Sequence, residues 1–140
     1  MRAIIDLNVV LDVVQRRVPR YAASALVLSR VAERHLEGAL PSHAVPILHY
    51  IVGRFASREK AGELIDWLLR DFDIVETGKT DLVLARNLGF ADFEDAIVAA
   101  CAVRGGCDLI VTRNIADFAK SPVPAWTPEE LLARDAAPGE

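Results

Sequence analysis

Short apolar runs alternate with helical patterns along the 140 residues of this chain, and no other feature constrains its fold so strongly. Runs of four or five residues, several of them β-branched, fit buried strands. Between these runs, apolar residues recur at the three- and four-residue spacing of amphipathic helices. Strands that alternate with helices indicate a doubly wound α/β domain. The predicted strands cover residues 2–6, 39–42, 72–75, 108–112 and 123–126.

Helix ends are marked by residues that satisfy free backbone groups. Side chains of Ser, Asp and Thr accept hydrogen bonds from the first free N–H groups of a helix, and glycine favours the residue just past its end. The predicted N-caps are Ser42, Ser57, Asp92 and Thr127, and the predicted stops are Gly38 and the pair Gly105-Gly106.

Composition limits the class of protein. Hydrophobic residues make up 52% of the chain, which argues against disorder. The net charge is −4, from 16 basic and 20 acidic residues, so the chain does not grip nucleic acid by bulk charge, although a nucleic-acid substrate stays open. No apolar run approaches the roughly 18 residues that span a bilayer, and no signal peptide opens the chain. We expect a soluble, cytoplasmic protein with no membrane partner.

The two cysteines, Cys101 and Cys107, show neither the spacing nor the histidine partners of a zinc site. The first falls in an apolar helix and the second just before a strand. We predict two buried free thiols in a reducing compartment.

Three aspartates stand where predicted strands end or helices begin. Asp6 closes the first strand, Asp95 lies at the start of a helix, and Asp117 follows the strand at residues 108–112. Ligands of an open parallel sheet bind beyond the carboxyl ends of its strands. Acids gathered there repel one another unless a cation lies between them. The sequence therefore predicts an oxygen-lined divalent metal site and metal-assisted hydrolysis of a phosphate ester.

Each aspartate alone also has a structural explanation. Asp6 could cap the helix that follows it, and Asp117 could answer the dipole of a short helix. Asp92 and Asp95 are spaced as N-cap and N3, so capping is favoured for Asp92, whereas Asp95 can serve both purposes. Only the three acids together favour a functional site.

Three segments, at residues 4–12, 92–96 and 112–118, occur in an order that resembles the PIN domain, in particular the toxin ribonucleases of the VapC type. The resemblance covers residues 3 to about 132. It implies a five-stranded parallel sheet flanked by helices, Mg²⁺ or Mn²⁺, and cleavage of single-stranded RNA by the toxin of a toxin–antitoxin pair. It also implies an antitoxin partner and a homodimer. We assign residues 1–132 to a PIN-like domain and residues 133–140 to a polar tail.

The resemblance carries individual roles to this chain. Asp6, Asp95 and Asp117 match the acids that hold the metal, and Asn114 stands where many relatives have a further Asp. Supporting roles fall to Asn8, Thr112 and Asp92, of which Asn8 and Thr112 match polar residues that orient the site.

One departure from the family pattern concerns a glutamate that the family carries early in the helix after the second strand. Its place falls at or near Ile47, and no carboxylate occurs between Glu37 and Glu59. With one acid fewer, we expect weak Mg²⁺ binding. We also expect a raised pKa for at least one of Asp6, Asp95 and Asp117.

Two histidines of the same helix are separated by six residues, which places their side chains about 120° apart around the axis and disfavours a shared metal ion. We expect His43 at the surface of the first turn and His49 partly buried near the mouth of the cleft.

The departure leaves a second function open. A PIN fold with little or no catalysis would bind RNA or a protein partner. RNA cleavage in Mg²⁺ or Mn²⁺, compared with EDTA, separates the two. A small phosphatase is a distant third, because the chain reads Asp6-Leu7-Asn8 where an Asp-x-Asp motif is needed.

Overall fold

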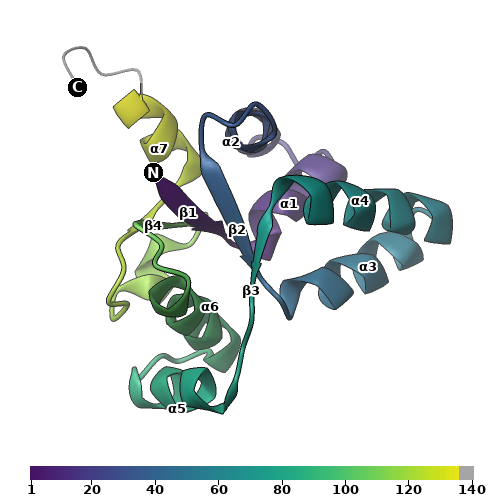
Figure 1. Cartoon of the computed structure of the whole chain (residues 1–140). Coiled ribbons are helices and arrows are strands. Elements are labelled where there is room, and N and C mark those ends of the chain that lie inside the picture. The colour runs from purple at the N-terminus through teal and green to yellow at the C-terminus, as the bar shows by residue number, and fades with distance from the viewer. Residues whose placement is uncertain (136–140) are drawn as a thin grey trace.

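The computed structural model describes residues 1–135 and contains one five-stranded sheet in which all neighbouring strands are parallel (Figure 1). The strand order is β3-β2-β1-β4-β5. This confirms the predicted α/β class and the five-stranded parallel sheet. The strands are β1 (Arg2–Ile5), β2 (Glu37–Pro41), β3 (Asp73–Val75), β4 (Leu109–Val111) and β5 (Ala125–Trp126).

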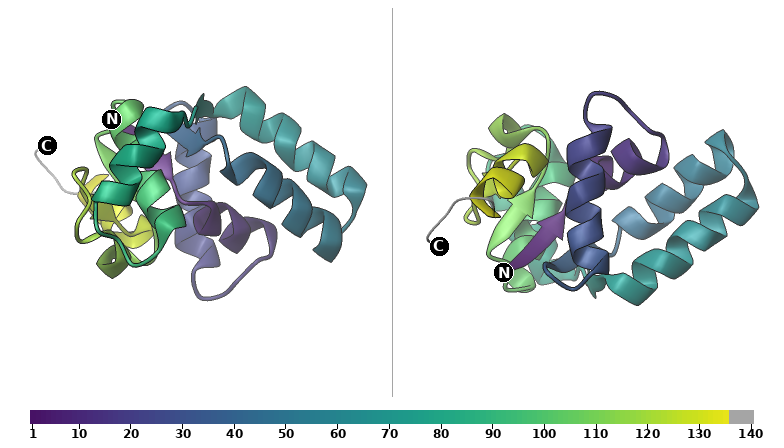
Figure 2. Two further views of the ribbon diagram at one scale, coloured as in Figure 1. Left: turned by 90° about the horizontal axis from the view of Figure 1, so that it is seen from below. Right: turned by 90° about the horizontal axis from the view of Figure 1, so that it is seen from above.

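Helices cover both faces of the sheet. A larger apolar core joins one face to α1 (Leu7–Val14), α2 (Tyr21–Ala32), α3 (Ala44–Phe55), α4 (Arg58–Asp71) and α7 (Pro128–Asp135). A smaller core joins the other face to α6 (Phe93–Arg104) and the 3₁₀ helix η1 (Ile115–Phe118), and α5 (Lys79–Asn87) packs on α6. The hairpin formed by α3 and α4 projects away from the sheet (Figures 1 and 2). No helix within residues 1–135 is long and apolar enough to cross a membrane.

Strand β1 explains why the sheet is buried on both sides. Ala3 and Ile5 lie in the larger core and Ile4 lies in the smaller one, and all three are fully buried. Successive side chains of a strand point to opposite faces, so a continuous apolar run fits a strand covered on both faces.

Three of the predicted N-caps are confirmed. The Ser57 hydroxyl accepts from the Lys60 N–H at 3.0 Å, and Asp92 accepts from two N–H groups of α6. Thr127 and Glu130 form a reciprocal pair at the start of α7, each side chain accepting from the other residue's N–H. These caps depend on residues three positions apart, which is why the sequence reveals them.

Two predicted helix signals were wrong. Gly38 does not end α2, which stops at Ala32, but lies inside β2. A Cβ on Gly38 would lie 2.8 Å from a methyl group of Val31, so the glycine lets a helix approach the strand closely. Ser42 does not cap α3, because the residue in the N-cap position is His43. The Ser42 N–H instead bonds to the carbonyl of Val75 and extends the pairing of β2 with β3.

The predicted helix stop after α6 and the two predicted free thiols are confirmed. Gly106 has a φ of +63° just past α6, which confirms the predicted stop. Cys101 and Cys107 are buried and unpaired. Helix α7 continues to Asp135, three residues past the predicted domain end at 132, and residues 136–140 of the predicted tail lie outside the described residues.

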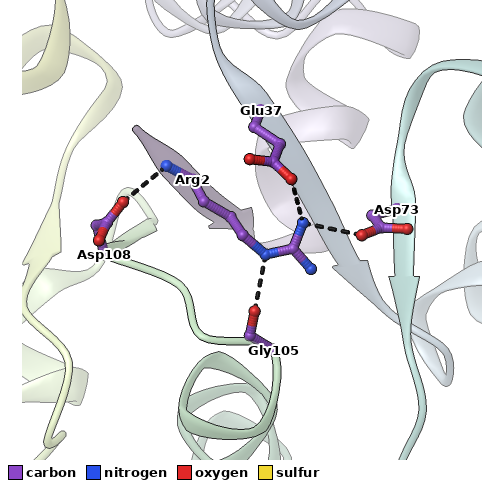
Figure 3. Close-up of polar contacts among 5 residues, drawn as sticks. All are labelled: Arg2, Glu37, Asp73, Gly105 and Asp108. Carbon is purple, nitrogen blue, oxygen red and sulfur yellow. Dashed lines mark hydrogen bonds and ion pairs between the residues drawn. The ribbon is translucent and has the colours of Figure 1, made fainter.

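Arg2 fastens the amino-terminal edge of the sheet (Figure 3). Its guanidinium donates to Glu37 at 2.8 Å, to Asp73 at 2.9 Å and to the Gly105 carbonyl at 2.8 Å. Its backbone N–H donates to the Asp108 carboxylate at 2.9 Å. One side chain therefore joins β1, β2, β3 and the loop before β4.

We predict that Arg2→Ala lowers the free energy of unfolding by about 1–2 kcal/mol, because it removes three hydrogen bonds to partners of which two are exposed. Arg70→Ala is the matched control, since Arg70 is 67% exposed and bonds only to the neighbouring Asp71 among the contacts described. Urea unfolding measures both variants. Equal midpoints for the two variants would contradict the role given to Arg2.

Candidate functional site

The predicted site residues lie where the strand order of the sheet reverses. From β1, the chain builds outward through β2 to β3 on one side, and then returns to place β4 on the other side. Asp6 directly follows β1 and Thr112 directly follows β4. Connections leave in opposite directions at such a switch point and open a crevice beyond the strand ends, where doubly wound folds bind ligands.

Asp6 is a buried carboxylate held in place by Thr112. The Asp6 side chain is 3% exposed, and the Thr112 hydroxyl donates to its Oδ2 at 2.9 Å. The Asn114 N–H in turn donates to that hydroxyl oxygen at 3.2 Å. Burial raises the pKa of Asp6, and the hydrogen bonds from Thr112 and the Asn8 backbone oppose this only in part. The Thr112 hydroxyl thus holds the Asp6 carboxylate in place, whereas Asp6 makes no capping hydrogen bond to α1.

The mouth of α6 carries three acids. Asp92 Oδ1 caps the helix by accepting from the N–H groups of Glu94 at 2.8 Å and Asp95 at 3.2 Å. Carboxylate oxygens of Asp92, Glu94 and Asp95 all lie within 4.8 Å of one another. Asp92 is therefore the cap that the sequence indicated, and it also belongs to an acidic cluster.

Asp95 is the electrostatic centre of the site. Burial, followed by the charges of Asp92, Glu94, Asp6 and Asp117, raises the pKa of Asp95 to about 7. The structure thus brings acids from β1, α6 and η1 close enough to disfavour the ionised form of Asp95. The expectation of a raised pKa among the three aspartates is confirmed for Asp6 and for Asp95.

Asp117 faces the same crevice from η1. It lines a pocket of about 430 Å³ together with Asp92, Asp95 and Lys120. The Lys120 ammonium donates to the Gly89 carbonyl at 3.2 Å and supplies a cation at the rim. Asp117 and Asn114 are both exposed, and so these two predicted site residues contact solvent directly.

The segment that carries Thr112, Asn114 and Asp117 is fixed to α1 by a buried ion pair. The Arg113 guanidinium bonds to Asp12, whose side chain is fully buried, and Arg17 approaches the same oxygen at 3.8 Å. A buried carboxylate needs such partners, because burial otherwise disfavours its charge. Asp12 is thus a structural acid that holds the segment after β4 in position.

Sequence reasoning missed Glu94 and misplaced both histidines. His43 is not a free surface residue, because its Nε2 lies 3.1 Å from Glu94 Oε1 and its side chain is 24% exposed. His49, expected to be partly buried, is exposed. Glu94 was detectable in principle, because it precedes Asp95 in the first turn of one helix. The contact between His43 and Glu94 spans 51 positions of the chain, and no local pattern indicates it.

The donor atoms of the site suit a hard divalent cation. Asp6, Asp95 and Asp117 offer carboxylate oxygens, and oxygen is the ligand that Mg²⁺ prefers. Burial and, after it, the charges of the neighbouring acids raise the pKa of Asp95 to about 7. A bound cation would reverse this effect, so the residues present fit the metal.

Comparison with known proteins decides the family. The family model for the PIN domain matches residues 2–116, most of the chain. The chain belongs to the PIN domain family. No curated protein sequence matches it.

Solved structures share the PIN fold at low sequence identity. VapBC2 from Rickettsia felis, bound to a DNA fragment from its promoter, gives a TM-score of 0.68 at 17% identity, with 91% of this chain and 98% of that chain covered. A toxin–antitoxin complex from Klebsiella pneumoniae gives 0.69 at 18% identity, with 90% and 97% covered. VapBC-1 from nontypeable Haemophilus influenzae gives 0.68 at 12% identity, with 92% and 99% covered. The fold is therefore that of VapC-type PIN domains.

We predict that Asp95→Asn stabilises the metal-free protein near pH 8. The pKa of Asp95 is about 7 in the folded state, against a reference value of 3.8. A raised folded pKa gives stability that is present below about pH 4 and is lost as the pH rises towards 7. In EDTA, the melting temperature of the wild type should fall over this range more steeply than that of Asp95→Asn.

Addition of Mg²⁺ or Mn²⁺ at pH 8 should raise the melting temperature of the wild type by linkage and leave Asp95→Asn unchanged. Asp66→Asn, at an exposed position of α4, is the matched control and should behave like the wild type. Parallel pH profiles for wild type and Asp95→Asn would contradict the electrostatic account.

Proposed function

We propose that this PIN domain is a metal-dependent endoribonuclease that cleaves single-stranded RNA as the toxin of a toxin–antitoxin pair. The observation that carries the proposal is the acidic lining of one crevice. Asp92, Asp95 and Asp117 line the same pocket, and carboxylate oxygens of Asp92, Glu94 and Asp95 lie within 4.8 Å of one another. The crevice lies at the switch point of the sheet, where an α/β fold binds its ligand.

In this proposal, Asp6, Asp95 and Asp117 hold Mg²⁺ or Mn²⁺, assisted by Asn114. Such an ion, when bound, lowers the pKa of water and offsets charge on a scissile phosphate. Thr112 fixes the carboxylate of Asp6 through its hydroxyl, Asp92 fixes the first turn of α6, and Asn8 lies in the first turn of α1 beside Asp6. Lys120 at the rim of the pocket is a candidate contact for a substrate phosphate.

The test is cleavage of single-stranded RNA with Mg²⁺ or Mn²⁺. We expect EDTA to abolish cleavage, and Asp6→Asn or Asp95→Asn to reduce it by at least about 100-fold, as loss of a group that stabilises the transition state commonly does. Asp66→Asn should retain full activity. Cleavage by Asp95→Asn at the native rate would refute the metal-nuclease proposal.

The alternative is a PIN module that binds RNA or a protein partner with little catalysis. One observation favours it: α3 contributes no carboxylate, and Ile47, where the family has its glutamate, is an apolar residue that is 36% exposed. RNA binding without cleavage, unaffected by Asp95→Asn, would support this alternative.

Partner binding is proposed for the apolar surface of the helical hairpin. Large apolar side chains of α3 and α4 are exposed, among them Tyr50 at 65%, Phe55 at 79% and Leu69 at 57%. A groove of about 420 Å³ between the ends of α1 and α3 is lined by Val14, Val52 and Phe55. Exposed apolar patches mark interaction sites. We assign these surfaces to a homodimer and to an antitoxin, the kind of partner found in the related complexes.

We expect light scattering at micromolar concentration to give the mass of a symmetric homodimer. Tyr50→Lys should shift the mass towards the monomer, because it places a charge in the proposed interface. Leu26→Lys, on α2 at a position that is 56% exposed, is the matched control. A monomer for the wild type at this concentration would contradict the dimer.

A further inference from the structure

The contact between His43 and Glu94 joins the start of α3 to the first turn of α6. His43 lies at the N-cap position of α3 and Glu94 lies in the first turn of α6. Their side chains meet at 3.1 Å. A carboxylate can only accept, so the His43 Nε2–H donates and Glu94 Oε1 accepts. His43 Nδ1 is buried without a hydrogen-bond partner, so the contact with Glu94 is the side chain's polar anchor within the described residues.

Glu94 acts on the same acids that the proposed function assigns to the cation. Its carboxylate lies within 4.8 Å of those of Asp92 and Asp95. Glu94 therefore shares the acidic cluster at the first turn of α6 with Asp95, which the proposed function names as a ligand of the cation.

A glutamate in this position needs something to hold it. Its side chain is 38% exposed, and repulsion from the neighbouring carboxylates of Asp92 and Asp95 favours rotamers that point into water. The hydrogen bond from His43 opposes that rotation, because a charged acceptor makes it stronger than a neutral bond. Attraction between the Glu94 carboxylate and the positive end of the α6 dipole would not by itself select a rotamer directed at the other acids.

The position of His43 also relates to the acid that α3 lacks. His43 and Ile47 are four residues apart, and residues at this spacing lie on one face of a helix. In the family, a glutamate lies on this face of the helix at or near the position of Ile47. In this chain, His43 lies on the same face, one turn earlier. That histidine contacts Glu94 in the first turn of α6.

We propose that Glu94 supplies a fourth carboxylate to the cation site in place of the glutamate missing from α3, and that His43 is the positioning residue that holds it there. This inference rests on the proposed function for the existence of the cation. The four acids would then come from the end of β1, the first turn of α6 and η1.

The test measures binding of Mn²⁺ to the intact protein, with the spectroscopic signal of the free ion as the readout. Glu94→Gln removes the charge and keeps the shape, and we expect it to raise the Kd by roughly tenfold or more. His43→Ala and His43→Leu remove the donor, and we expect each to raise the Kd by about three- to tenfold. His43→Gln keeps an N–H donor and should restore most of the affinity.

A second His–Glu pair provides the matched control. His35 and Glu33 lie 3.5 Å apart with side chains that are 69% and 62% exposed, just before β2 and so at the opposite edge of the sheet. His35→Ala and Glu33→Gln should leave the Kd unchanged. Equal melting temperatures in EDTA would establish that the His43 variants are folded.

The outcomes separate this inference from the proposed function. If Asp95→Asn loses Mn²⁺ whereas Glu94→Gln and His43→Leu bind like the wild type, the proposed function stands and the inference is overturned. If Glu94→Gln weakens binding but the His43 variants do not, or if His43→Gln fails to rescue, the positioning role of His43 is overturned. If the wild type does not bind Mn²⁺, the proposed cation site fails and the inference fails with it.

Discussion

Parallel pairing on both sides of β1 is the constraint on which the rest of the structure depends. β1 pairs with β2 on one side and with β4 on the other, so its two ends are fixed relative to every other strand. Asp6 follows the carboxyl end of β1 and lies beside Thr112. The amino end delivers Arg2 to the contacts that join the strand starts. Because strand length sets the separation of these two residues, a four-residue strand defines both the functional edge and the structural edge of the sheet.

The buried acids of the molecule differ in whether an arginine pairs with them, and this difference separates structural carboxylates from candidate functional ones. Asp12 is fully buried and meets Arg113 and Arg17, and Asp81 is buried and meets Arg104 at 2.8 Å. Each has a cation beside it, as a buried charge requires. Asp6 accepts a hydrogen bond from the Thr112 hydroxyl. Both Asp6 and Asp95 have other acids nearby. Acids that lack a cationic partner in a crevice are candidates for binding one.

The sequence was sufficient for features that depend on neighbours along the chain. Strand and helix identities follow from apolar spacing, and the caps at Ser57, Asp92 and Thr127 follow from side chains that reach three residues ahead. The assignment of Asp6, Asp95 and Asp117 to one site rests on the rule for strand ends, together with the resemblance to the PIN domain, and it stays a prediction. A raised pKa was expected from like charges at one edge, whereas burial is the larger cause of the shift at Asp95 and the charges of its neighbours come second.

Features set by tertiary contacts were out of reach. Gly38 was misread because its role is set by Val31 and Phe72, which pack on it from other elements. His43 was misplaced because its partner is distant in the sequence, and Ser42 because it pairs with Val75 rather than with its own helix.

The projecting hairpin of α3 and α4 has a consequence for engineering. Its turn at Ala56 and Ser57 lies one twelve-residue helix, or about 18 Å, from His43. A fluorophore attached at this turn would therefore lie at a distance from the acids and next to Phe55 of the proposed partner surface, where its signal would respond to partner binding.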